Sequence, residues 1–220
     1  MPRWYHSVDE LPRALPIFPL TGALLLPRGE LPLNVFEPRY LAMVDTAMAG
    51  PRLIGMIQPS ESDGKTSSHT LTSVGTAGRL TSFKETEDGR YLITLSGICR
   101  FRVAGEISVL TPYRQIQADY THYAGDLISN EEPELPRTRL AAALKDYLQR
   151  RDMKADWSAV MNAPAEMLVN ALVTLCPFEP AEKQALLEAL TWQERVDTLV
   201  ALLEISGAGV GSGGGGGSVN

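Results

Sequence analysis

Residues 31–40, Leu-Pro-Leu-Asn-Val-Phe-Glu-Pro-Arg-Tyr, form the most distinctive stretch of this chain. Leu31–Phe36 is typical of an extended segment, and Pro38 suits the first position of a helix, where the N–H that proline lacks would have no partner. Apolar residues then recur at helical spacing until Gly50 and Pro51, which do not continue a helix. The stretch therefore predicts a strand that leads directly into a helix at about 38–49.

Short apolar segments lie on both sides of this helix along the chain. Residues 15–20 form an apolar run with two prolines, which indicates an edge strand or a strand that enters a barrel. Asp88-Gly89 lies between two alternating segments and is a strong hairpin signal. Strands are expected at 52–58, 74–83, 90–96, 98–103 and 113–123. Six or more short strands around one helix predict a closed or nearly closed β structure.

The pattern becomes helical beyond Asp126. Thr191 and Glu194 fit a capping box that opens the last helix. Residues 207–220 contain 8 of the 19 glycines and are typical of a flexible tail. Helices are expected at about 135–151, 163–175, 180–190 and from 191 onward. The predicted fold class is α+β, with a β-rich domain at 1–125, a helical bundle at 126–206 packed on it and a tail at 207–220.

Charge is distributed unevenly along the chain. Residues 1–125 contain 12 basic and 12 acidic residues, so the whole net charge of −6 lies in residues 126–220. A sequence pI near 5.2 disfavours a non-specific nucleic-acid binder and a polybasic membrane anchor. No signal peptide or apolar run of membrane-spanning length is evident. Cys99 and Cys176 lack the spacing of a redox or metal pair, so we expect two free thiols in the cytoplasm.

Motifs for several kinds of chemistry are missing from the sequence. It has no phosphate-binding loop, no dinucleotide fingerprint, no HExxH and no nucleophile elbow. The three histidines are far apart, so we expect no metal site. Because the motifs above are missing, we also expect no cofactor and no catalytic residue. Cys99 and Cys176 fit buried structural thiols, and a cryptic cysteine hydrolase is the alternative.

Two groups of residues remain as candidates for binding a partner. The corner at 36–40 either determines the fold or contacts a partner through an aromatic ring and an arginine. Four arginines are expected on strands, Arg79, Arg100, Arg102 and Arg114, with Arg100 and Arg102 on the face opposite Cys99 and Phe101. They form either an ion-paired outer surface or a basic stripe that reads carboxylates or peptide backbone. The predicted partner-binding set is Phe36, Arg39, Tyr40, Arg79, Arg100 and Arg102.

Several strings taken together resemble the N-terminal substrate-binding domain of the Lon protease. The similarity covers about residues 13–206 and is strongest to stand-alone bacterial proteins that contain this domain alone. The strings that carry it are residues 15–20, 31–40, 52–56, 75–80, 88–91, 97–103 and 177–184.

This resemblance implies a PUA-like β pseudo-barrel with one inserted helix, followed by a helical bundle. It implies recognition of unfolded or degron-bearing polypeptides, with a protease as a further partner. The chain ends before an ATPase or peptidase module would begin, so the expected function is non-catalytic. Since PUA-like folds elsewhere bind RNA, an RNA-binding protein is the alternative; the strand arginines support it and the charge balance opposes it.

Overall fold

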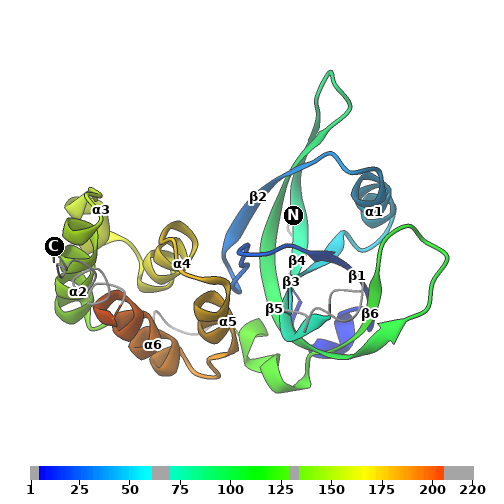
Figure 1. Ribbon diagram of the computed structural model, residues 1–220. Helices are drawn as coiled ribbons and strands as arrows, with labels where there is room; N and C mark the ends of the chain where they lie inside the picture. Colours follow the sequence, from blue (N-terminus) through cyan, green and yellow to red (C-terminus); the bar gives the residue numbers. More distant parts are fainter. Residues whose placement is uncertain (1–4, 61–69, 129–133, 206–220) are drawn as a thin grey trace, which may run out of the picture. The chain divides into compact units, whose positions relative to one another are not determined.

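The computed structural model describes residues 5–60, 70–128 and 134–205, so the tail expected at 207–220 lies outside it. The chain forms two compact units, of which the first comprises Met1–Asn130 and Thr174–Glu188. This β unit contains the elements η1 (Val8–Glu10), β1 (Ala14–Pro19), β2 (Glu30–Val35), α1 (Pro38–Ala49), β3 (Leu53–Pro59), β4 (Leu71–Glu85), β5 (Tyr91–Ile107), β6 (Gln115–Asp119), η2 (Thr121–Leu127) and α5 (Pro180–Glu188). Figure 1 shows the strands curling into a ring with α1 beside them.

The sheet closes on itself. Its strand order is β2-β5-β4-β3-β1-β6, and β5 also pairs with β6. Strand β1 is parallel to β3 through Ile17 and Gly55, and antiparallel to β6 through Leu15 and Ile116. The expected closed β structure with one inserted helix is therefore confirmed, and the proline-interrupted run at 15–20 is a strand that enters the ring.

Strand β5 is longer than the sequence pattern suggests. Its first half pairs with β2 and its second half with β6, so the strands expected separately at 90–96 and 98–103 are one strand. Gly97 does not interrupt this strand. Because glycine has no side chain, the backbone of residues 26–29 can approach the strand closely at this position. A Cβ at Gly97 would lie 2.0 Å from the Leu26 carbonyl oxygen. The Gly97 N–H donates to the Gly29 carbonyl at 2.9 Å, and its carbonyl accepts from Arg28 at 2.8 Å.

Strand β6 is shorter than expected. It ends at Asp119, and the predicted continuation to Tyr123 is wrong because the chain turns into η2. The Asp119 carboxylate accepts the Thr121 N–H at 2.9 Å, a local hydrogen bond that competes with a strand ladder.

Phe101 fills the interior of the ring. Its side chain is fully buried, and it lies against Gly55 and Gly75 on the neighbouring strands. A Cβ at Gly75 would lie 2.6 Å from Phe101 Cζ and 2.5 Å from the Met56 carbonyl oxygen. The aromatic ring therefore occupies space that only glycines leave open.

A second apolar cluster lies under α1. The helix begins at Pro38 and ends at Ala49, as the sequence predicts. Its buried residues Tyr40, Met43, Val44 and Ala47 join a cluster with residues of the strands, among them Phe18. The Tyr40 ring stacks on Phe18 with 4.1 Å between centroids and 16° between planes.

Helix α5 belongs to the β unit, although its place in the sequence suggests the helical bundle. The buried Gln58 amide donates to the Pro180 carbonyl at 3.0 Å and to Gln184 Oε1 at 3.1 Å. Gln184 in turn donates to the Val74 carbonyl at 3.1 Å. These contacts between distant segments have no periodic signal in the sequence.

The domain limits of 1–125 and 126–206 stay a prediction.

The second unit is helical. It contains α2 (Arg137–Arg150), α3 (Trp157–Asn162), most of α4 (Ala165–Leu175) and α6 (Trp192–Ile205). The capping box of α6 is confirmed, since the Glu194 N–H donates to Thr191 Oγ1 at 3.1 Å and the Thr191 N–H to Glu194 Oε2 at 3.2 Å. The unexpected α3 is capped by Asp156, which accepts from two backbone N–H groups. Within the three described ranges, no helix is long and apolar enough to cross a bilayer.

The contact between Phe101 and Gly75 predicts the effect of adding one methyl group. Gly75→Ala should lower the free energy of unfolding by about 1–3 kcal/mol, because the Cβ has no space without moving Phe101 or the β3 backbone. The measurement is urea unfolding followed by tryptophan fluorescence. Gly105→Ala on β5 is the matched control, since nothing lies within 4 Å of its added Cβ. Equal destabilisation by both substitutions would contradict the packing described here.

Candidate functional site

A groove of about 520 Å³ opens on the β unit beside the start of α1. Its volume is within the range of ordinary ligand sites. The apolar part of its lining is Pro19, Leu20, Tyr40, Pro59, Pro112, Tyr113 and Pro180. The polar part is Thr21, Arg39, Ser60 and Arg114. We call this surface the Tyr40–Tyr113 groove.

The walls of the groove are held by the apolar core. Tyr40 and Tyr113 are both nearly buried members of the cluster under α1, and Phe18 stacks on the Tyr40 ring. Proline supplies much of the remaining wall, with a fixed φ and no N–H donor. The groove is therefore an apolar surface set on rigid backbone.

Two guanidinium groups lie at the groove. Arg39 forms an ion pair of 2.8 Å with Glu37, and its Cζ lies 4.6 Å from the Tyr40 ring centroid. Arg114 donates from Nε and Nη2 to the two carboxylate oxygens of Glu106. Both ion pairs are partly exposed to solvent.

The Tyr40 hydroxyl stays protonated at neutral pH. Burial raises its pKa, and this effect outweighs the opposing charge of Arg39. The pKa also responds to Glu37, which raises it, and to Arg114, which lowers it. A neutral phenol next to two guanidinium groups can donate a hydrogen bond to a bound anion.

Exposed apolar side chains lie close in sequence to residues that line the groove. Phe36 is 63% exposed and lies three residues before Arg39, and Leu110 is fully exposed two residues before Pro112. Such residues on a connecting segment are typical of surfaces that contact other proteins. Figure 1 shows the long connection between β5 and β6 that carries Leu110.

The predicted partner-binding residues separate into different places. Arg39 and Tyr40 line the groove, and Phe36 lies near it in sequence. Arg79 is elsewhere, with Nη1 donating to the Tyr5 hydroxyl at 3.4 Å. Arg102 is exposed on β5 and does not line the groove. The role of these residues in binding stays a prediction.

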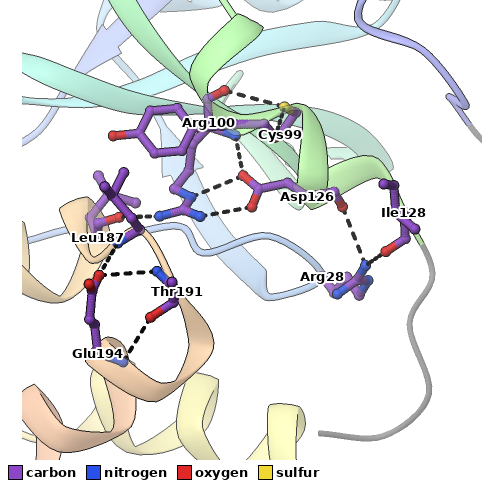
Figure 2. Close-up of polar contacts among 10 residues, drawn as sticks. Arg28, Cys99, Arg100, Asp126, Ile128, Leu187, Thr191 and Glu194 are labelled. Carbon is purple, nitrogen blue, oxygen red and sulfur yellow. Dashed lines mark hydrogen bonds and ion pairs between the residues drawn. The ribbon is translucent and has the colours of Figure 1, made fainter.

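Arg100 is buried, and its guanidinium donates to acceptors within the chain. Figure 2 shows its guanidinium donating to both carboxylate oxygens of Asp126, at 3.0 and 2.9 Å, and to the Leu187 carbonyl at 2.9 Å. The Arg100 N–H also donates to Asp126, and the guanidinium lies 4.3 Å from the Tyr123 ring centroid. Arg100 therefore joins β5, η2 and α5. Because it is buried, it does not form an exposed basic stripe with Arg102.

The cysteines are placed as structural thiols. Cys99 and Cys176 are both buried. Burial raises the pKa of the Cys99 thiol far above its usual range, and the Cys99 Sγ donates to the Tyr123 carbonyl at 3.3 Å. A thiol with a raised pKa is a poor nucleophile. Among the described residues, no cluster of three or more His, Cys, Asp or Glu is placed to hold a metal ion.

Several groove residues carry no signal in the sequence. Leu20, Pro112 and Tyr113 come from separate segments, and only the closed ring brings them to α1. Arg114 is expected on a strand, but it lies in the connection that precedes β6. The prolines in these connections are the one local hint, since proline is confined to sheet edges and loops.

Comparisons with known proteins identify relatives of the chain. Residues 14–204 match the family model of the ATP-dependent protease La (LON) substrate-binding domain. Lon protease 2 of Myxococcus xanthus is 24% identical over 201 residues, which are 89% of this chain and 24% of that protein. The Lon protease of Flavobacterium johnsoniae is 30% identical over 177 residues, or 79% of this chain and 18% of that protein. The chain thus spans about a quarter or less of the length of these curated relatives.

Solved structures share the fold. The Lon N-terminal domain protein from Xanthomonas campestris superposes with a TM-score of 0.59 at 25% identity, over 86% of this chain and 97% of that one. The N-terminal domain of the Mycobacterium avium complex Lon protease gives a TM-score of 0.59 at 17% identity, with the same shares of each chain covered.

The buried ion pair of Arg100 predicts a large effect of removing its partner. Asp126→Ala should lower the free energy of unfolding by about 3–5 kcal/mol, because it leaves a guanidinium buried without its counter-charge. Asp88→Ala removes an exposed partner of Arg90 and should leave the urea midpoint unchanged. The double substitution Arg100→Met, Asp126→Leu should recover most of the loss, since no unpaired charge remains. A single Asp126→Ala as stable as Asp88→Ala would contradict the structural role of this pair.

The buried thiols predict slow modification of the native protein. Ellman's reagent should find no rapidly reacting thiol before denaturation and both thiols after it, because reaction needs an accessible thiolate. Rapid labelling of native Cys99 would reopen the possibility of a cysteine nucleophile.

Proposed function

Because the chain belongs to the family of the ATP-dependent protease La (LON) substrate-binding domain, we propose that it is a non-catalytic module that recognises unfolded or degron-bearing polypeptides. The Tyr40–Tyr113 groove is its binding site. A protease is the context in which captured polypeptides would be used. We place this activity in the cytoplasm, where reducing conditions keep both cysteines as thiols.

The groove is the observation that carries the proposal. An extended polypeptide exposes apolar side chains, and these fit a surface built from tyrosine and proline. Tyr40 and Tyr113 are only 7% and 5% exposed, and a tyrosine side chain has few rotatable bonds, so ordering them costs little entropy. Tyr40 and Tyr113 are already held in place by the core, which reduces that cost further.

The flanking residues support a polypeptide rather than a small ligand. Phe36 and Leu110 are exposed apolar side chains that lie within three residues of groove residues in the sequence. A small molecule enclosed in a pocket gains nothing from exposed residues outside it, whereas a chain segment that crosses the groove can contact them.

A bulky side chain in the lining of the groove tests the proposal. Thr21 lines the groove and is itself exposed, so Thr21→Trp should fill the groove without disturbing the core. The affinity for a fluorescently labelled, reduced and carboxymethylated protein should fall about tenfold, as expected when the central contacts of an interface are lost. Fluorescence anisotropy measures this affinity.

Thr81→Trp is the matched control, because Thr81 is exposed on β4 and does not line the groove. It should bind the unfolded protein as the unsubstituted chain does. Failure of the unsubstituted chain to bind any unfolded protein would refute the function, and equal binding by both tryptophan variants would refute the site.

A further inference from the structure

The lining of the Tyr40–Tyr113 groove is positively charged, although the chain as a whole carries −6. Arg39 and Arg114 are its only charged members among the described residues, and no carboxylate lines it. Tyr40 lines the same groove as both arginines, and the Arg39 Cζ lies 4.6 Å from its ring centroid. This arrangement complements an anion.

The ion pairs at these arginines leave room for such an anion. Glu37 takes the Nε and Nη2 donors of Arg39, and no other described residue accepts from its Nη1. The Arg39 and Glu37 side chains are 54% and 44% exposed, so the pair is weak and open to exchange. Glu106 beside Arg114 is 51% exposed. A bound carboxylate can join the Arg39 guanidinium directly, and at Arg114 it can exchange with the exposed Glu106 carboxylate.

The apolar walls decide which kind of anion fits. Pro19, Pro112 and Tyr113 line the same groove as the two arginines, so a ligand that fills it combines a charge with an apolar group. A nucleic-acid backbone instead needs a row of cations that tracks successive phosphates. Among the residues that the structure describes, two arginines line the groove, which is too few for a row of phosphates. The observations therefore favour a polypeptide carboxylate over a phosphate chain.

We propose that the Tyr40–Tyr113 groove selects polypeptide segments in which a carboxylate adjoins an apolar side chain, with Arg39, Tyr40 and Arg114 as the donors to the carboxylate. This inference rests on the proposed function. The carboxylate is either an acidic side chain or the C-terminus of a chain. Both place two oxygen acceptors within reach of planar guanidinium donors.

Labelled short peptides of equal length test the inference by fluorescence anisotropy. Three of the peptides contain the same phenylalanine pair, followed by Asp, Asn or Lys, and have an amidated C-terminus. The fourth peptide ends at the phenylalanine pair and has a free C-terminal carboxylate. The Asp peptide should bind about tenfold more tightly than the Asn peptide and more tightly still than the Lys peptide, as a charge-assisted hydrogen bond predicts.

Substitutions assign the preference to the groove. Arg39→Gln and Arg114→Gln should each reduce the ratio of Asp to Asn affinity to about twofold or less. Tyr40→Phe should reduce the ratio partly, since it keeps the ring on Phe18 and removes the hydroxyl. Arg90→Gln is the control and should keep the full ratio, because Arg90 pairs with Asp88 at 2.8 Å on the exposed hairpin.

The outcomes separate this inference from the proposed function. Equal binding of the Asp, Asn and Lys peptides keeps the function and overturns the selectivity. Absence of binding by every peptide and by the unfolded protein overturns both. Tight binding of the fourth peptide alone supports the inference with a chain terminus as the source of the carboxylate. Displacement of the peptide by a single-stranded RNA, with loss of RNA binding in Arg39→Gln, overturns it in favour of phosphate.

Discussion

The contact of Phe101 with Gly55 and Gly75 is the constraint on which the β unit depends. A closed ring of few strands has room for little more than its own side chains. Here one aromatic ring occupies the interior because two adjacent strands present no Cβ to it. With Phe101 in place, β1, β3, β4, β5 and β6 can pair around it in a closed order.

Strand β5 transmits this constraint to the rest of the unit. Successive side chains of a strand point to opposite faces, so Arg100 points away from the interior that Phe101 fills. Its charge is satisfied by Asp126 of η2 and by the Leu187 carbonyl of α5. Adjacent residues thus close the ring on one face and attach two helical segments on the other. The sheet could not have recruited α5, which is distant in sequence, through local propensity alone.

The candidate site is a consequence of the same closure. Tyr40 stacks on Phe18 in the core and is also one of the residues that line the groove. The corner at 36–40 therefore has a structural role, and its role in recognition stays a prediction. Pro112, Tyr113 and Arg114 of the connection between β5 and β6 complete the lining, and the pairing of these strands in the ring fixes where that connection begins and ends.

Much of this protein follows from its sequence alone. The helix at 38–49, the hairpin at Asp88-Gly89 and the capping box at Thr191 depend on neighbouring residues, and each lies where the pattern predicts it. The family resemblance likewise rests on local strings, and the family model confirms it over residues 14–204. The tertiary structure alone decided that Gly97 admits backbone within a continuous strand, that Arg100 is buried, and that Arg114 lines the same groove as Tyr40. These outcomes depend on contacts between distant segments, such as those 87 and 122 residues apart, and a periodic pattern does not encode which distant partner will satisfy a buried charge or complete a groove.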